Sequence, residues 1–125
     1  MILDTNALSA FFDGAPALVR KLSEAPALYL PVIVIGEYRF GLKASRFRRE
    51  REKVLREFAK ICTVLPILES SARPYARIRH DLRAAGTPIP QNDIWIAALA
   101  LEYDLPVISR DAHFKAVKAI KVFSW

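Results

Sequence analysis

The chain begins Met1-Ile2-Leu3-Asp4-Thr5-Asn6, and an apolar run from Ala7 to Phe12 follows. Three apolar residues that lead into a carboxylate and two small polar residues predict a buried strand that ends at Asp4 and turns into a helix. In open α/β sheets, ligands bind at the carboxyl ends of the strands. Asp4 is therefore a candidate site residue, although Asp and Asn before an apolar run also serve commonly as helix caps.

The composition predicts a single soluble globular domain over residues 1–125. With 53% hydrophobic and 26% charged residues, the chain is long enough to form a core without disulfides. The single Cys62 excludes an internal disulfide and suggests a buried thiol, and two histidines argue against a zinc site. We find no signal-peptide pattern and no apolar stretch long enough to span a membrane, which predicts a cytoplasmic location. A native start upstream of Met1 stays open.

Strands alternate with helices along the chain. We expect strands at residues 1–3, 28–30, 63–68, 106–108 and near Val122. We expect helices at 7–12, 17–24, 32–44, 47–62, 70–85 and from Gln91 or Asn92 to about Tyr103, with a short helix around Phe114. This alternation predicts an α/β fold with a largely parallel sheet that is covered by helices on both faces.

The net charge of +6 favours an acidic partner such as nucleic acid. Residues 43–60 carry eight basic and three acidic side chains. The segment 47–62 has the pattern of an amphipathic helix, and its basic face is either a solvated surface or a surface for RNA or a partner. Its expected apolar stripe is Phe47, Val54, Leu55, Phe58 and Cys62, and its expected ion pairs are Arg48–Glu52, Glu52–Arg56 and Lys53–Glu57.

Four carboxylates occupy positions from which a parallel sheet could bring them together. Asp4 ends the first strand, and Asp111 lies three residues past the fourth. Asp93 lies in the first turn of the helix before the fourth strand, and Glu37 sits among apolar residues on the helix after the second. Each has a simpler alternative, because Asp93 and Asp111 also suit helix N-termini and Glu37 could pair with a basic neighbour on the surface.

Together, the four acids indicate a metal site. Carboxylates that converge in one cleft repel each other and stay ionised only beside a cation. Mg²⁺ and Mn²⁺ prefer such oxygen ligands, and either ion can activate a water and neutralise charge that builds up on a phosphodiester. Without the four acids, the rest of the chain has nine acids against nineteen bases, a net +10. An acidic centre on a basic surface is typical of a nuclease.

The chain resembles the PIN-domain ribonucleases, and in particular the VapC toxins of VapBC toxin–antitoxin pairs. The resemblance covers nearly the whole chain, and its motifs occur in the family's order. These motifs are Leu3-Asp4-Thr5-Asn6, Gly36-Glu37, Pro88-Ile89-Pro90-Gln91-Asn92-Asp93 with Ile96-Ala97-Ala98, and Ile108-Ser109-Arg110-Asp111-Ala112-His113-Phe114.

This resemblance implies a PIN-like three-layer sandwich around five parallel strands in the order 3-2-1-4-5. It also implies metal-dependent endonucleolytic cleavage of RNA with one or two Mg²⁺ or Mn²⁺ ions. The implied partners are an RNA substrate, a second copy of the chain in a homodimer, and a cognate VapB-type antitoxin in a heterotetramer or larger complex. Residues that could contact the antitoxin or belong to the core are Leu8, Phe11, Phe12, Tyr38 and Phe40.

The family's functional residues carry over to matching positions of this chain. The acidic quartet of catalytic residues and metal ligands matches Asp4, Glu37, Asp93 and Asp111, and the position of Asp111 varies more within the family than the other three. Small polar residues that support the carboxylates match Thr5 or Asn6, together with Asn92 and Ser109. Thr5 or Asn6 could also cap the first helix.

Two features near the motifs depart from the family or lack a function. Pro90 stands where the family commonly has glycine, and proline stiffens the loop before Asp93. His80 and His113 have no evident role, and we expect His113 to pack against or cap the short helix beside Phe114.

Three rivals are weaker. A haloacid-dehalogenase-type phosphatase needs a second aspartate at the position where this chain has Asn6. A phosphoacceptor signalling domain needs a lysine at the end of its last strand, and this chain has Ser124-Trp125 there. The remaining alternative is a catalytically silent PIN-like module that holds RNA or a protein. Four intact carboxylates argue against it, because idle acids would repel RNA; finding them far apart would favour it.

Overall fold

The computed structural model describes residues 1–125 and contains one parallel sheet of five short strands in the order β3-β2-β1-β4-β5. This confirms the predicted order. The central strand β1 pairs with β2 on one side and with β4 on the other. The strands are β1 (Ile2–Leu3), β2 (Tyr29–Pro31), β3 (Thr63–Leu65), β4 (Val107–Ile108) and β5 (Val122–Phe123).

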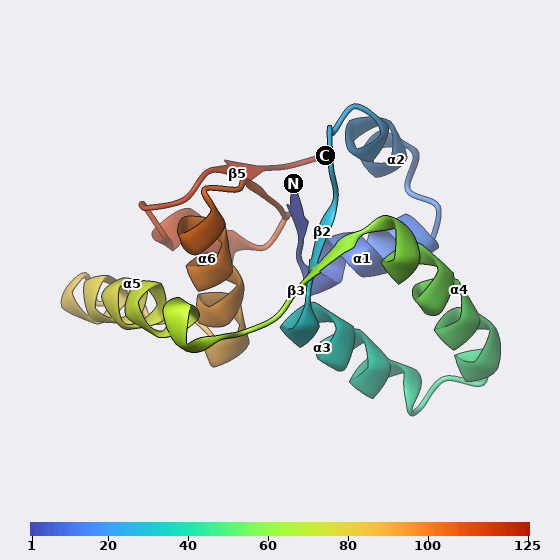
Figure 1. Cartoon of the computed structure of the whole chain (residues 1–125), viewed down its shortest axis with the longest axis horizontal. Helices are drawn as coiled ribbons and strands as arrows, with labels where there is room; N and C mark the ends of the chain where they lie inside the picture. The colour runs from blue at the N-terminus through green and yellow to red at the C-terminus, as the bar shows by residue number, and fades with distance from the viewer.

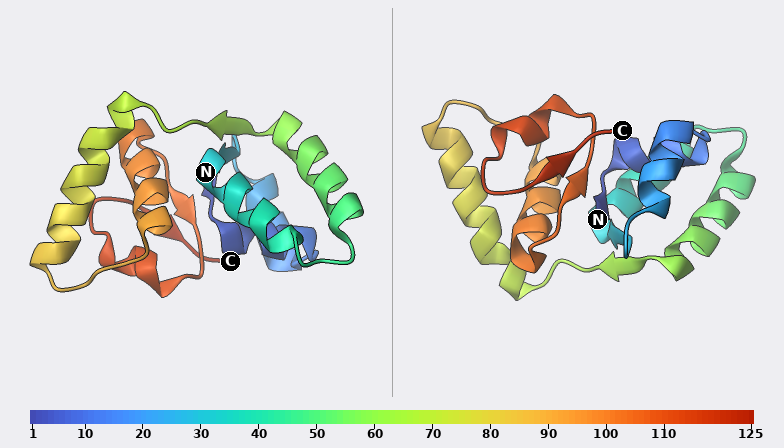
Figure 2. Two further views of the ribbon diagram at one scale, coloured as in Figure 1. Left: turned by 90° about the horizontal axis from the view of Figure 1, so that it is seen from below. Right: turned by 90° about the horizontal axis from the view of Figure 1, so that it is seen from above.

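Helices cover the sheet on both faces, as Figure 1 shows. The crossovers from β1 to β3 supply α1, α2, α3 and α4, and the chain from β3 to β5 supplies α5, α6 and two short 3₁₀ helices. Figure 2 shows these two groups on opposite sides of the strands. The helices are α1 (Thr5–Phe12), α2 (Pro16–Ser23), α3 (Val32–Leu42), α4 (Arg48–Ile61), η1 (Glu69–Ser71), α5 (Ala72–Ala84), α6 (Gln91–Tyr103) and η2 (Ala112–Ala116).

The core explains why such short strands suffice. All four residues of β1 and β4 are fully buried, which is expected of parallel strands that have helices on both faces. On the helices, the buried apolar positions include Leu8 on α1 and Tyr38 on α3. Both therefore belong to the core, whereas Phe40 is 80% exposed. No helix is both long enough and apolar enough to cross a membrane.

The prediction for α4 was right in its extent and wrong in its details. Leu55 and Phe58 are buried, but Phe47 and Val54, assigned to the same stripe, are about half exposed. None of the three expected ion pairs within the helix forms. Instead, Glu52 binds Arg39 of α3 at 2.8 Å and Glu57 binds Lys60 at 2.8 Å. Glu52 can reach Arg39 because α3 packs against α4, whereas Glu57 pairs three residues along its own helix.

Cys62 follows α4 and is only half-buried, rather than fully buried. Burial raises the pKa of its thiol to about 11. The thiol is therefore protonated at neutral pH, which agrees with the predicted absence of a nucleophilic role.

The chain reverses its direction of winding between β1 and β4. From β1 the chain winds towards β3, and it then returns to the other side of β1 to form β4 and β5. Such a reversal is the switch point at which open α/β sheets place their ligand sites. Asp4 follows β1 directly and Ser109 follows β4 directly, so the two residues lie at the switch point.

Candidate metal centre

Asp4 is the most buried carboxylate of the chain, with a side chain that has 3% exposure. It is the N-cap of α1, and its Oδ1 accepts a hydrogen bond of 2.6 Å from the backbone N–H of Ala7. Its Oδ2 accepts a hydrogen bond from the hydroxyl of Ser109. The suggestion that Thr5 or Asn6 caps this helix is therefore wrong, because Asp4 itself serves as the cap and also faces the switch point.

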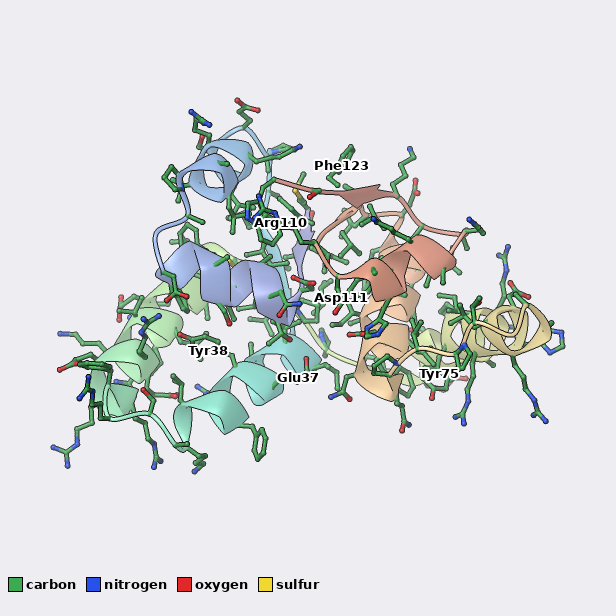
Figure 3. All side chains as sticks on the ribbon, turned by 180° about the vertical axis from the view of Figure 1, so that it is seen from behind. Glu37, Tyr38, Tyr75, Arg110, Asp111 and Phe123 are labelled. Atoms are coloured by element: carbon green, nitrogen blue, oxygen red, sulfur yellow. The ribbon has the colours of Figure 1, made fainter.

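Glu37 comes to the same region from α3. Its Oε2 accepts a hydrogen bond from the hydroxyl of Thr5, and its Oε1 accepts one of 2.9 Å from the side-chain amide of Asn92. These bonds connect α3 to the first residues of α1 and α6. Figure 3 shows Glu37 and Asp111 in the same region of the molecule, beside the start of α1. Of the two candidates for a supporting residue, Thr5 makes this contact and the exposed Asn6 does not.

Asp93 and Asp111 meet through His113. The Nδ1 atom of His113 lies 2.9 Å from Oδ2 of Asp93 and 3.0 Å from Oδ1 of Asp111. Asp111 also caps the 3₁₀ helix η2, because its Oδ1 accepts from the backbone N–H of His113 at 2.9 Å. The expectation that His113 packs against or caps this helix is wrong. Its ring instead bridges two of the four predicted carboxylates.

Ser109 links Asp4 to Asp111. Its hydroxyl donates to Asp4, and the same oxygen accepts a hydrogen bond of 2.9 Å from the backbone N–H of Asp111. Ser109 is itself buried, so its orientation is restricted. Pro90 caps the start of α6 with a φ of −55°, a value that the proline ring favours. Pro90 therefore lies directly before the helix that carries Asp93, and the stiffening of this loop stays a prediction.

The pKa values of Asp4 and Asp93 depend on their burial and on the other acids of the site. Burial raises the pKa of Asp4 to about 6, two hydrogen bonds oppose the rise, and the charges of Asp111 and Asp93 add to it. Burial also raises the pKa of Asp93, the hydrogen bond from His113 opposes this, and the charges of Asp111 and Glu37 raise it further. Each of the four carboxylates therefore feels, or exerts, the field of another member of the group.

The donor groups fit a divalent cation. One ligand atom each from Asp93, Asp111 and His113 lies within 4.8 Å of the other two. Asp4 adds a buried carboxylate whose pKa is raised mainly by its burial and further by the charges of Asp111 and Asp93. A cation in this region would relieve both the burial of charge and the repulsion between acids. Carboxylate oxygens are the donors that Mg²⁺ and Mn²⁺ prefer, and the His113 ring nitrogen contacts two of these carboxylates.

The fold and the site together define a doubly wound α/β protein with an acidic candidate metal centre at its switch point. The family model described as "PIN domain" matches residues 1–120. The chain belongs to the PIN-domain family and, within it, to the VapC proteins.

Individual relatives agree with this assignment. Ribonuclease VapC5 of Mycobacterium tuberculosis is 34% identical over 122 residues, which cover 93% of this chain and 86% of the relative. The solved structure of VapBC-5 from the same organism, a member of the VapBC family of toxin–antitoxin systems, has a TM-score of 0.73 and 28% identity, covering 99% and 97% of the two chains. VapBC2 of Rickettsia felis, solved with a DNA fragment from its promoter, has a TM-score of 0.90 with the same coverage. At 20% identity, that likeness concerns the fold alone.

Proposed function

We propose that this protein is an endoribonuclease that hydrolyses RNA phosphodiester bonds and acts as the toxin of a type II toxin–antitoxin pair. The observation that carries the proposal is the set of hydrogen bonds that directs four carboxylates from four elements towards one switch point. Asp4, Glu37, Asp93 and Asp111 are the proposed catalytic residues. The VapC relatives from Mycobacterium tuberculosis and Haemophilus influenzae are ribonucleases by name, which supports the same activity here.

The proposed cofactor is Mg²⁺ or Mn²⁺, as one or two ions held by Asp4, Glu37, Asp93 and Asp111. When bound, such an ion makes a water more acidic and neutralises charge on the phosphodiester. His113 already contacts two of these carboxylates, so we add it to the proposed site as a residue that positions them. Zinc is less suitable, because the site has one imidazole and no thiolate.

The chain's own residues prepare the site before substrate arrives. With a pKa of about 6, Asp4 is mostly ionised at neutral pH and can therefore accept a cation. The backbone of Ala7 and the hydroxyl of Ser109 hold its two oxygens in place. Thr5 and Asn92 hold Glu37 in the same way. Because these bonds already exist, little ordering remains to be done when substrate binds.

Cleavage of RNA with and without a chelator tests the proposal. We expect the protein to cut single-stranded RNA in the presence of Mg²⁺ or Mn²⁺ and to lose this activity in EDTA. The Asp4→Asn/Asp93→Asn variant should be inactive, whereas Asp81→Asn, on the exposed side of α5, should keep its activity. Activity that survives EDTA or the double substitution overturns the proposal. Binding of RNA without any cleavage favours the catalytically silent module instead.

The proposed partners are a cognate VapB-type antitoxin and a second copy of the chain. With cytoplasmic RNA as the substrate, the protein acts in the cytoplasm. Overproduction should arrest growth, and co-expression of the neighbouring gene of its operon should relieve the arrest. A protein that is harmless, monomeric and purifies without an operon partner contradicts the toxin assignment but not the nuclease.

A further inference from the structure

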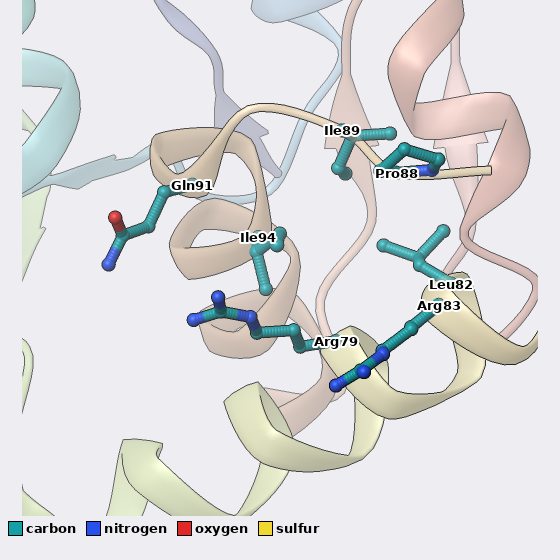
Figure 4. A pocket seen from close by; sticks show the side chains of 7 residues that line it. All are labelled: Arg79, Leu82, Arg83, Pro88, Ile89, Gln91 and Ile94. Carbon is teal, nitrogen blue, oxygen red and sulfur yellow. The ribbon is translucent and has the colours of Figure 1, made fainter. Parts of the chain in front are cut away.

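A hollow lies between α5 and the start of α6, the helix that carries Asp93. Its volume is about 430 Å³, within the range of sites that hold small molecules. Figure 4 shows the seven side chains that line it. They come from α5, from the loop before α6 and from the first turn of α6: Arg79, Leu82, Arg83, Pro88, Ile89, Gln91 and Ile94.

The charge of this hollow is positive and unopposed. Arg79 and Arg83 lie one turn apart on α5, and both guanidinium groups are drawn at the hollow in Figure 4. No acidic residue lines it, and neither arginine takes part in a salt bridge of the chain. The side-chain hydrogen bond of Arg79 goes to the neutral hydroxyl of Tyr75 at 3.1 Å. Two arginines without carboxylate partners are suited to an anion, and a planar guanidinium matches a phosphate especially well.

The remaining walls are mainly apolar. Leu82 and Ile94 are buried beneath the hollow, and Pro88 and Ile89 form its side towards the loop. Gln91 adds an amide that can both donate and accept hydrogen bonds. A ligand that combines an anionic group, a flat apolar body and a hydrogen-bonding edge fits this lining. A nucleotide has these three parts, with the phosphate towards the arginines and the base towards the apolar side chains.

The position of the hollow connects it to the metal centre. Gln91 and Ile94 flank the Asn92-Asp93 pair in the first turn of α6. Asn92 holds Glu37, and Asp93 contacts His113. An α-helix is only about 10 Å across. A strand of RNA that places one phosphate at the metal centre can therefore place a neighbouring nucleotide at the hollow.

We propose that this hollow binds a nucleotide of the RNA substrate next to the one that is cleaved, and so contributes to the choice of cleavage sequence. This inference rests on the proposed nuclease function. RNA explains the hollow better than an acidic protein segment, because its base accounts for the apolar walls and its continuous backbone accounts for the position beside Asp93.

The test compares two pairs of arginines on the same helix. Arg79→Ala/Arg83→Ala removes two charges from the hollow, and Arg73→Ala/Arg77→Ala removes two charges from a separate surface that Glu69 and Glu102 also line. A fluorescent pool of random single-stranded RNA serves as the probe. Its binding is measured in EDTA, where no cleavage is expected, and its cleavage is measured with Mn²⁺. Thermal unfolding of each variant shows that it is folded.

We expect the Arg79/Arg83 variant to bind the pool about tenfold or more weakly than the control variant, with a matching rise in KM and a similar kcat. The slope of log K against log salt should fall by about 0.7 for each phosphate that the variant no longer neutralises. Ile89→Asp, which places a carboxylate before intact arginines, should weaken binding comparably. Sequencing of the cleaved ends should show a weaker base preference at one position beside the cut.

Equal RNA binding by the two double variants overturns the inference. The inference is also overturned if the Arg79→Ala/Arg83→Ala variant no longer binds the operon partner but still binds RNA as the control variant does. The hollow would then be a binding site for a protein. A wild-type protein that binds the pool but never cleaves it contradicts the proposed function instead, and the binding measurements still decide whether the hollow holds RNA.

Discussion

At the scale of single residues, Asp4 combines two functions that usually belong to different side chains. One carboxylate oxygen caps α1 and the other is held by Ser109 at the switch point. A residue between a buried strand and the following helix occupies the N-cap position of that helix. It also lies at the carboxyl end of the strand, where open α/β sheets bind their ligands. The cap that the structure shows therefore does not exclude the proposed role of Asp4 as a metal ligand.

The burial of Asp4 makes the metal-free protein less stable at neutral pH. Its carboxyl has an ordinary pKa of 3.8 and a pKa of about 6 in the folded chain. The folded state therefore binds the proton more tightly, and stability falls as pH rises through this range, by about 3 kcal/mol in total. Asp4→Asn removes this penalty but weakens the contact with Ser109, which costs about 1 kcal/mol.

We therefore expect Asp4→Asn in EDTA to be about 2 kcal/mol more stable than the wild type at pH 7.5 and no more stable near pH 4. Urea unfolding at the two pH values measures the difference. Asp81→Asn, at an exposed position on α5, controls for the general loss of one negative charge. A variant that is less stable than the wild type at both pH values contradicts the expected penalty.

His113 is the site residue that the sequence did not reveal. Its ring joins Asp93 to Asp111, yet a histidine beside an apolar residue on a short helix has no distinctive pattern. The signal available in the sequence was its position two residues after Asp111, since one turn of 3₁₀ helix is enough to bring both side chains to the same edge.

His113→Ala should destabilise the metal-free protein more than the metal-bound protein. Without the imidazole, the side-chain contact that joins Asp93 to Asp111 is lost, whereas a bound cation would offset the repulsion between the two carboxylates in both proteins. Because the ring is 45% exposed, we expect a loss of less than about 1 kcal/mol in EDTA and a smaller one with Mn²⁺. His80→Ala, on the exposed face of α5, is the control. Equal losses in both buffers would show that His113 acts only in packing.

At the scale of elements, three helices meet at Glu37. Thr5 is the first residue of α1 and Asn92 lies at the start of α6, and both donate to the carboxylate that α3 presents. Partners that orient a metal ligand commonly contribute 10- to 100-fold to affinity or activity. Thr5→Val keeps the shape and removes the hydroxyl, so it should lower the affinity for Mn²⁺ by roughly tenfold.

Recovery of affinity by Thr5→Ser would assign this effect to the hydroxyl. The cleavage rate of each variant is measured as a function of Mn²⁺ concentration. The apparent dissociation constant for Mn²⁺ should change more than the cleavage rate at saturating Mn²⁺. If Thr5→Val and wild type need the same Mn²⁺ concentration, the bond between Thr5 and Glu37 has no role in metal binding.

Elements were predictable where one periodic pattern decided them. The strand predicted at residues 1–3 and the helices predicted at 17–24 and 70–85 agree with β1, α2 and α5 to within two residues at each end. The pairing of α4 was not predictable, because Glu52 chooses an arginine on α3 over its helical neighbours. That choice depends on how two helices pack, and the sequence of one helix does not contain this information.

At the scale of the whole molecule, the alternation of strands and helices predicted a largely parallel sheet, whereas the strand order was implied by the resemblance to the PIN-domain family. Parallel strands end at the same edge of a sheet, and this is why the four acids could be grouped as candidates before the fold was known. The hollow at Arg79 and Arg83 was not predictable, because its walls come from α5, a loop and α6, which meet only in the folded chain. The sequence indicated only that α5 is basic.

Metal binding should stabilise the entire fold, since the proposed ligands join α1, α3, α6 and the chain after β4. An ion at a concentration 100-fold above its dissociation constant adds about 2.7 kcal/mol, which for a domain of this size corresponds to a rise in Tm of about 10 °C. We expect this rise with Mn²⁺ at pH 8 and a smaller one at pH 5, where protons occupy Asp4. Differential scanning calorimetry measures it, with potassium chloride at equal ionic strength as the control. A rise of the same size in Asp4→Asn/Asp93→Asn would place the ion elsewhere, because that variant lacks two of the proposed ligands.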